Sequence, residues 1–271
     1  MAIQKIAELL GKKIWQTNLF IPDYHVGEIG QWKIVPGGQL LHDWGYYSDQ
    51  CLVAMNPALA RRSDSKSDDH SNWAIWMSLT PHEIESQELG CHYAYGHTVV
   101  MGLGMGWVAA NIALNPKVTR VTIIEIDSEV IDLFTKSGAF DSLPETAQNK
   151  ISIIHANAVE WKPDSHYPVN FLFADIWLHL AEKETLNQVR IMQQHIHAKT
   201  IYYWGQEIAI YNAIKNTITI SPEQIKTAVE EKIKLPLLIP DDRNYGDMIE
   251  KVIQNRMMRR LPIKLDVSHV N

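Results

Sequence analysis

Two hydrophobic patterns alternate through the middle of the chain. Short runs of β-branched and other apolar residues are typical of strands that are buried on both faces, and between them apolar residues recur at helical spacing. Runs of the first kind lie at residues 99–101, 118–126, 151–154, 169–173 and 200–204. Because strands that alternate with helices form parallel sheets covered by those helices, the pattern predicts a doubly wound α/β architecture with a mainly parallel sheet.

The region before the first of these strands has a different pattern. After a short amphipathic helix, Trp32 and Ile34 alternate with polar residues in a predicted strand that ends at Pro36. The polar run that starts at Arg61 is poor in apolar residues, which predicts an exposed loop. We therefore expect residues 1–75 to form a small β-rich appendage.

The C-terminal region is predicted to be mostly helical. Ser221 and Pro222 are typical of a helix start, and a last helix is expected at about residues 248–260. A sixth or seventh strand of the sheet is not evident. Beyond the appendage, the chain is thus expected to contain an α/β domain at residues 76–205 and a helical extension at residues 206–271.

The strongest functional signal is the turn after the first of the five strands. Gly102, Gly104 and Gly106 alternate there, and glycine allows both positive φ and close approach of a ligand to the backbone. Glu125 ends the next strand, near the spacing at which an acid meets ribose hydroxyls in a Rossmann-like unit. The dinucleotide motif G-x-G-x-x-G needs a glycine where this chain has Trp107, so an NAD-dependent dehydrogenase is the least favoured hypothesis. An ordinary strand-to-helix turn is the structural alternative.

Composition narrows the class of protein. Hydrophobic residues make up 46% of the chain, enough for a sizeable core, and no apolar run approaches the roughly 18 residues of a membrane span. The formal net charge of −6 argues against a broad nucleic-acid surface. Cys51 and Cys91 are too few for a disulfide framework or a zinc site, and His195 and His197 lack the spacing of helical metal ligands. We expect a cytoplasmic protein with reduced thiols, no metal and no membrane association.

The glycine pattern G-x-G-x-G resembles motif I of class I S-adenosylmethionine-dependent methyltransferases. From about residue 76 to residue 205 the chain also looks like the catalytic domain of spermidine synthases, which share that fold. The family's V-E-I-D motif after the second strand is matched by Ile124, Glu125, Ile126 and Asp127, and the acids that the chain retains elsewhere are Glu83, Glu88 and Asp175.

The chain departs from the synthase pattern at several positions. The family's glutamine is replaced by Met77, two of its acids by Met105 and Leu178, and its Asp-Gly/Ala pair by Asn157 and Ala158. Carboxylates are the groups that hold cationic polyamines. The missing acids therefore favour a methyltransferase over an aminopropyltransferase.

The resemblance implies a set of cofactor-binding residues. The backbone around the three glycines would cradle the amino-acid and ribose portion of S-adenosylmethionine, and Glu125 would accept hydrogen bonds from both ribose hydroxyls. Asn157 would meet the adenine edge, and Ile126 and Ala158 would line the ring. A turn residue bonded to its own backbone is the alternative for Asn157.

The resemblance also implies an acceptor side of the site. Asp175 would act as the catalytic general base, or as an orienting group that also contacts the cofactor; its structural alternative is a helix N-cap. Glu83 would bind the acceptor, although its spacing from Thr80 also fits a capping box. Trp177 and His179 follow Asp175 and are candidates for lining the acceptor pocket, with packing as the alternative.

Three hypotheses for function follow. The leading one is a methyltransferase that uses S-adenosylmethionine on an unidentified small-molecule acceptor, with a homodimer as an option. The runner-up is a spermidine-synthase-like polyamine aminopropyltransferase, and the third is a non-catalytic module that only binds the cofactor.

Overall fold

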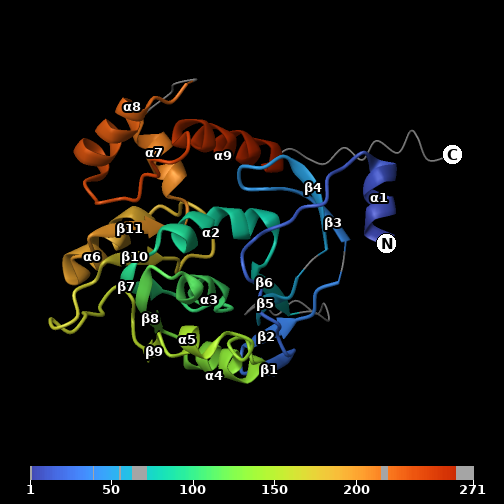
Figure 1. Ribbon diagram of the computed structural model, residues 1–271, viewed down its shortest axis with the longest axis horizontal. Coiled ribbons are helices and arrows are strands. Elements are labelled where there is room, and N and C mark those ends of the chain that lie inside the picture. Colours follow the sequence, from blue (N-terminus) through green and yellow to red (C-terminus); the bar gives the residue numbers. More distant parts are fainter. Residues whose placement is uncertain (1, 39, 55, 63–71, 215–218, 261–271) are drawn as a thin grey trace.

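A five-stranded parallel sheet forms the centre of the molecule (Figure 1). The structure is a computed structural model and describes residues 2–38, 40–54, 56–62, 72–214 and 219–260. The strands follow the order β9–β8–β7–β10–β11, and every adjacent pair is parallel. Their bounds are β7 Gly96–Met101, β8 Val118–Glu125, β9 Ile151–His155, β10 Phe171–Ala174 and β11 Thr200–Tyr203. The doubly wound α/β fold predicted from the alternating pattern is confirmed.

The strand order reverses at β7. The chain runs outward from β7 to β8 and β9, and then returns to the other side of β7 to form β10 and β11. Because crossovers between parallel strands are right-handed, the helices that follow β7 and β10 cover opposite faces of the sheet. These helices are α3 (Trp107–Leu114) and α6 (Thr185–Ile196). In such sheets, ligands bind at the carboxyl ends of the strands where the order reverses.

Helix α2 (Pro81–Tyr93) packs closely on the sheet just before β7. The hydroxyl of Thr80 accepts a hydrogen bond from the backbone N–H of Glu83, so the predicted cap is present. On the buried face, a Cβ added at Gly90 would lie 2.3 Å from the ring of Phe173. A glycine at this position therefore lets α2 approach β10.

Helix α4 (Ser128–Ser137) follows β8. The side chain of Asp127 caps it by accepting from the N–H of Glu129, and Gly138 ends it in the left-handed conformation. A short helix, α5 (Glu145–Gln148), precedes β9.

The N-terminal region forms a second, antiparallel sheet of order β1–β2–β5–β6. Its strands are β1 Gly27–Ile29, β2 Trp32–Val35, β5 Ala58–Arg62 and β6 Trp73–Ser78, and a separate hairpin pairs β3 (Leu40–Trp44) with β4 (Gln50–Ala54). The single strand expected around Trp32 is in fact the hairpin β1–β2, because the chain turns at Gly30 with φ +54°. Trp32 and Ile34 share the buried face, as predicted.

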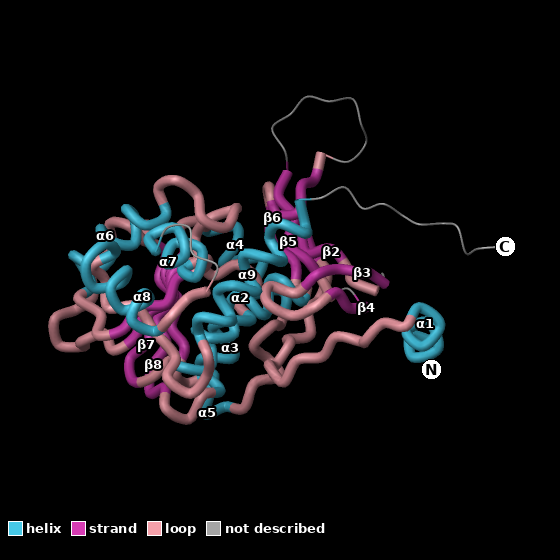
Figure 2. Tube along the Cα trace, turned by 90° about the horizontal axis from the view of Figure 1, so that it is seen from above, coloured by secondary structure: helices cyan, strands magenta, loops and turns pink. Residues whose placement is uncertain are grey.

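The N-terminal region also contains a helix and a polar run outside this sheet. Helix α1 (Ala2–Leu10) lies at the edge of the molecule, beyond the β3–β4 hairpin (Figure 2). The polar run expected to be a loop begins within β5 at Arg61 and Arg62. The rest of that run, residues 63–71, lies outside the described residues.

The C-terminal region is helical, as predicted. It contains α7 (Gln206–Ile214), α8 (Pro222–Thr227), a π-helical turn at Ala228–Ile233 and α9 (Tyr245–Arg260). Ser221 and Gln224 form a complete capping box at the start of α8. Among the described residues the central sheet gains no sixth strand, although Leu237 makes an isolated parallel bridge with Ile201 of β11. No helix in these ranges is long and apolar enough to cross a membrane.

Candidate functional site

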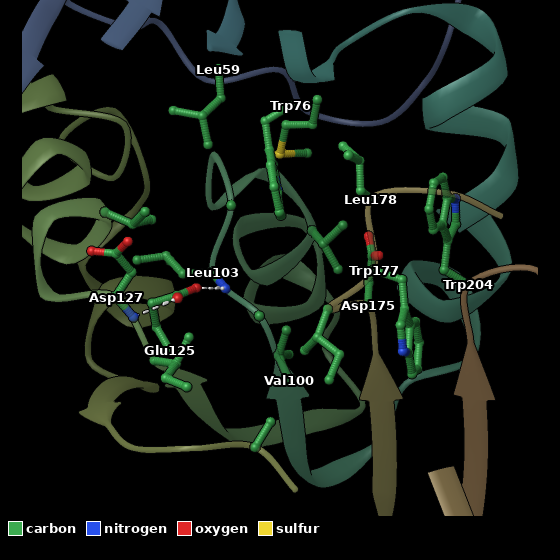
Figure 3. A pocket seen from close by; sticks show the side chains of 18 of the residues that line it. Leu59, Trp76, Val100, Leu103, Glu125, Asp127, Asp175, Trp177, Leu178 and Trp204 are labelled. Atoms are coloured by element: carbon green, nitrogen blue, oxygen red, sulfur yellow. Dashed lines mark hydrogen bonds between the residues drawn. The ribbon is translucent and has the colours of Figure 1, made fainter. Parts of the chain in front are cut away.

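A cavity of about 570 Å³ opens at the carboxyl ends of β7, β8 and β10. The loops after these strands form its floor, and the second sheet forms its roof, where Leu59 and Trp76 face the strand ends (Figure 3). Most residues proposed from the sequence line this one cavity, namely Gly102, Gly104, Glu125, Ile126, Asn157, Ala158, Asp175, Glu83 and Trp177. Gly106 and His179 do not line it. The cavity therefore lies at the sheet's switch point.

The glycine turn is left-handed at all three positions. Gly102, Gly104 and Gly106 have φ values of +95°, +51° and +71°. A Cβ on Gly102 would lie 2.1 Å from the backbone oxygen of Asp175, and one on Gly106 would lie 2.1 Å from the ring of Phe134. Contacts within the protein thus already require glycine at these positions. Because glycine has no side chain, the backbone at Gly102 and Gly104 is also open to the cavity.

The carboxylate of Glu125 is fixed at the edge of the cavity by two backbone amides. Its Oε2 accepts from the N–H of Leu103 and its Oε1 from the N–H of Asp127, both at 2.9 Å (Figure 3). Each carboxylate oxygen has a further lone-pair site. Glu125 can therefore accept two more hydrogen bonds from a ligand without moving.

The surface beside Glu125 is apolar and uncovered. Ile126 is 62% exposed, and Ala158, which also lines the cavity, is buried. The side-chain oxygen of Asn157 accepts from the N–H of Val159 at 3.0 Å, which is the turn interaction that competed with a ligand role. The amide nitrogen of Asn157 makes no hydrogen bond within the described part of the chain, so it can still donate to a ligand in the cavity.

Three polar side chains meet at the other end of the cavity: Asp175 after β10, and Glu83 and Gln87 on α2. Burial raises the pKa of Asp175 to about 7. Burial, together with the charge of Asp175, raises the pKa of Glu83 well above its ordinary value. The two carboxyl groups thus resist holding two negative charges at once.

Helix capping was the structural alternative for both acids, and neither side chain caps a helix in the structure. The side chain of Glu83 does not return to Thr80 but accepts from Nε2 of Gln87 at 2.6 Å. Asp175 caps no helix, since α6 begins ten residues later with Glu184 in the cap position. Neither acid is therefore explained by local helix capping.

The remaining predicted acceptor residues differ in their placement. Trp177 is buried, donates from Nε1 to Oε1 of Gln188 at 2.5 Å and packs edge-on against Tyr203, so only part of it borders the cavity. His179 is exposed, and its backbone N–H donates to Glu182. The structure does not bring His179 to the site.

Met105 and Leu178, which stand where the synthase pattern has acids, differ in their placement. Met105 is 2% exposed, lies outside the lining, and its carbonyl accepts from the hydroxyl of Tyr24 at 2.9 Å. Leu178 is 38% exposed and lines the cavity. An acid at the first position would be buried in the protein, whereas the second gives the cavity an apolar edge.

The roof of the cavity was not predictable from the sequence. Trp32, Arg61, Trp76 and Met77 line it from the second sheet, and Gln87 lines it from α2. The alternation around Trp32 indicated a buried face, but nothing in the sequence pairs that face with the strand ends. Only the packing of one sheet over the other brings these residues to the site.

The sheet order, the glycine turn and an acid at the end of the second strand define a Rossmann-like α/β domain with its cavity at the switch point. No protein-family model matches the chain. No curated protein matches it either.

Several solved structures are similar to part of the chain. They include the glycopeptide N-methyltransferase MtfA complexed with S-adenosyl-L-homocysteine, at 16% identity and TM-score 0.33, with 41% of this chain and 43% of that chain covered. TrmK of M. capricolum, in complex with S-adenosyl-homocysteine, has 11% identity, TM-score 0.33 and coverages of 44% and 48%. The 23S rRNA methyltransferase ErmE has 14% identity, TM-score 0.36 and coverages of 53% and 52%.

This chain spans about half the length of each of these three proteins. With TM-scores below 0.5, the similarities assign neither an activity nor an acceptor to this chain.

Proposed function

We propose that the chain binds S-adenosylmethionine in this cavity and transfers a methyl group from it to a small-molecule acceptor. The observation that carries the proposal is the Glu125 carboxylate, which two backbone amides hold at the cavity edge with acceptor capacity to spare. A ribose presents two neighbouring hydroxyl donors, which match the two carboxylate oxygens. Hydrogen bonds to such a charged group contribute about 1.5–3 kcal/mol each.

The neighbouring residues suit the rest of the cofactor. The exposed face of Ile126, with Ala158 beside it, offers an apolar surface for a purine ring. The free amide nitrogen of Asn157 can donate to a ring nitrogen. The open backbone at Gly102 and Gly104 can approach the amino-acid portion closely.

When bound, S-adenosylmethionine supplies a methyl group that its sulfonium already activates. The residues of the chain then need mainly to orient the acceptor and exclude water, and such positioning can lower a barrier by about 7–11 kcal/mol. The roof residues Trp32 and Trp76 cover the cavity, and the carboxyl of Asp175 can take up a proton from the acceptor. The backbone N–H of Asp175 donates to Met101 at 2.9 Å, which fixes this acid relative to the glycine turn.

A spermidine-synthase-like activity is the competing proposal, and the specific observation in its favour is that Glu83 and Asp175 both line the cavity. The apolar Leu178 and the buried Met105 weigh against it. Decarboxylated S-adenosylmethionine should bind far better than the carboxylated form if aminopropyl transfer is the true activity. Binding of cofactor without turnover on any acceptor would instead favour a non-catalytic module.

We also propose that residues 76–205 carry the cofactor, with residues 1–75 and 206–271 as flanking parts of a cytoplasmic protein. Strand β6 runs on to Ser78, so the first flanking part would reach slightly into the cofactor-binding part. Truncation at either boundary, followed by a cofactor-binding measurement, tests this division.

Substitution of Glu125 by alanine tests the cofactor proposal. We expect Glu125→Ala to weaken the binding of S-adenosylhomocysteine in calorimetry by about tenfold or more, because the ribose loses its charged acceptor. Glu231→Ala removes an exposed glutamate of the π-helical turn and serves as the matched control. Unchanged affinity in a folded Glu125→Ala variant would place the cofactor elsewhere.

A further inference from the structure

One end of the cavity offers hydrogen-bond acceptors almost without donors. Glu83 and Asp175 bring two carboxyl groups to it. Gln87 lies beside them and is fully buried. Its Nε2 donates to Glu83, while its amide oxygen has no partner within the described residues. A buried acceptor without a donor is costly, at about 1–3 kcal/mol. A ligand that brings several N–H groups would remove that cost.

Within the described ranges, no cation forms an ion pair with the acids at this end. The salt bridges among the described residues involve neither Glu83 nor Asp175. The positive charge of Arg259 acts to lower the pKa of Glu83, but the Arg259 guanidinium pairs with Asp43 at 3.2 Å. Apart from the hydrogen bond from Gln87 to Glu83, the two acids are therefore left with each other and with a ligand that enters the cavity.

The rest of the acceptor space is apolar and aromatic. Trp76, Trp177 and Trp204 line it together with Met77 and Leu178. Aromatic faces attract organic cations, by about 0.5–2 kcal/mol. The lining thus suits a body of rings or alkyl groups next to the acidic end.

Arg61 lines the roof near Trp32, on the side of the cavity where Asp127 and Glu125 also lie. The guanidinium of Arg61 lies 5.3 Å from the ring of Trp32 and 5.6 Å from the ring of Trp76, and it forms no ion pair with any residue that the structure describes. A long polyamine would place its further ammonium groups against the apolar and aromatic lining of the acceptor space. A single ammonium group is therefore the better match for the two acids.

We propose that the acceptor is a monoamine with an apolar or aromatic body, whose single ammonium group is held by Glu83, Asp175 and the amide oxygen of Gln87. The inference rests on the proposed methyltransferase function and specifies its substrate class.

The acid pair can accept the proton that the ammonium group loses before the methyl transfer. The ionised member of the pair takes one proton from the bound ammonium, which leaves a neutral amine and a protonated carboxyl group. The nitrogen lone pair forms the new carbon–nitrogen bond, while the methyl–sulfur bond breaks and its electron pair stays on sulfur. The product leaves as a methylated ammonium, and the carboxyl group returns its proton to water.

Matched pairs of probes test this substrate class. Calorimetry on the chain saturated with S-adenosylhomocysteine would compare 2-phenylethylamine with 2-phenylethanol and n-hexylamine with 1-hexanol. We expect at least one amine to bind about tenfold or more tightly than its alcohol, and more tightly than putrescine. The conservative variants Glu83→Gln and Asp175→Asn should each remove most of this preference, and the exposed-site control Glu231→Gln should keep it.

The outcomes separate this inference from the proposed function. If S-adenosylhomocysteine binds but neither amine exceeds its alcohol, the substrate class is wrong while the cofactor proposal stands. Tighter binding of putrescine than of both monoamines also overturns it, in favour of a polyamine. The comparison on the unaltered chain needs no variant, so a poorly folding substitution cannot obscure the result.

Discussion

At the scale of single residues, Glu125 is held in place before any ligand arrives. The hydrogen bonds from Leu103 and Asp127 fix its carboxylate through the backbone of the two loops that form the cavity floor. A group that is already ordered loses little conformational freedom when a ligand binds. Its spacing from the glycines predicted the position, whereas the two amide bonds follow from how the loops fold.

Gly102 is the residue whose substitution should cost most in the turn. We predict that Gly102→Ala lowers the free energy of unfolding by about 2 kcal/mol or more beyond Gly38→Ala, because overpacking adds to backbone strain. Gly38 is a matched control, since its φ is +101° and a Cβ there would meet nothing within 4 Å. At Gly102 the clash is with backbone, at 2.1 Å.

Chemical denaturation of both variants measures this difference. Equal destabilisation by the two substitutions would mean that positive φ alone, and not the contact with Asp175, requires glycine at residue 102.

Residue roles could be predicted only where local sequence decides them. The caps at Thr80 and Ser221 were predicted correctly because each depends on neighbours within a few positions. Glu83 has the spacing of a capping box, yet its side chain turns to Gln87 and the cavity. Its surroundings come from the distant Asp175, which no local pattern contains.

At the scale of elements, the β1–β2 hairpin is fastened to the start of α4. The indole N–H of Trp32 donates to Oδ2 of Asp127 at 2.8 Å, and the backbone N–H of Gln31 donates to Glu129 at 2.9 Å. Asp127 also accepts from the N–H of Glu129 and donates its own N–H to Glu125. The roof is thus connected to Glu125 through one residue, Asp127.

We predict that Trp32→Phe lowers the free energy of unfolding by about 1–2 kcal/mol, because Asp127 loses a donor that the smaller ring cannot replace. Trp76→Phe is the matched control, since Trp76 packs edge-on against Trp32 but makes no hydrogen bond within the described residues. Chemical denaturation compares the free energies of unfolding of the two variants, provided that both depend equally on denaturant concentration. A larger loss for Trp76→Phe would show that ring packing, and not the hydrogen bond, fastens the hairpin.

At the scale of the whole molecule, a buried carboxyl group joins the N-terminal and C-terminal regions. Glu207 of α7 accepts from the hydroxyls of Tyr46 and Tyr245, both at 2.9 Å, and it is completely buried. Tyr46 lies in the turn between β3 and β4, and Tyr245 begins α9. In addition, Asn255 donates to the carbonyl of Ser48 in the same turn.

This arrangement predicts how stability depends on pH. Burial raises the pKa of Glu207 from 4.5 to about 7, so between these values the folded state binds more protons than the unfolded state. The free energy of unfolding should then fall as pH rises through this window, by about 3 kcal/mol from this group. The raised pKa of Asp175 acts in the same window and with the same sign.

Denaturation at pH 5 and pH 8 measures the effect. Glu207→Gln should reduce the loss of stability between the two pH values by about 3 kcal/mol, and the exposed-site variant Glu231→Gln should leave it unchanged. An identical pH dependence in Glu207→Gln and the unaltered chain would show that this carboxyl group does not hold its proton as burial implies.

The strands of the central sheet could be predicted from the sequence, whereas the full set of residues that line the cavity could not. Strand β10 is a continuous apolar run and the buried part of β8 is β-branched, and the ends of these two strands bring Asp175 and Glu125 to one edge by topology alone. The roof depends on long-range packing, as between Trp32 and Asp127, 95 residues apart in the chain. The sequence therefore predicted the residues at the strand ends that line the cavity and did not predict most of its roof.

A crystal structure of the chain with S-adenosylhomocysteine tests the central claim most directly. We predict that both ribose hydroxyl oxygens lie within about 2.5–3.2 Å of the Glu125 carboxylate oxygens, with the purine ring against Ile126. A ligand bound outside this cavity, or a ribose turned away from Glu125, would contradict the account.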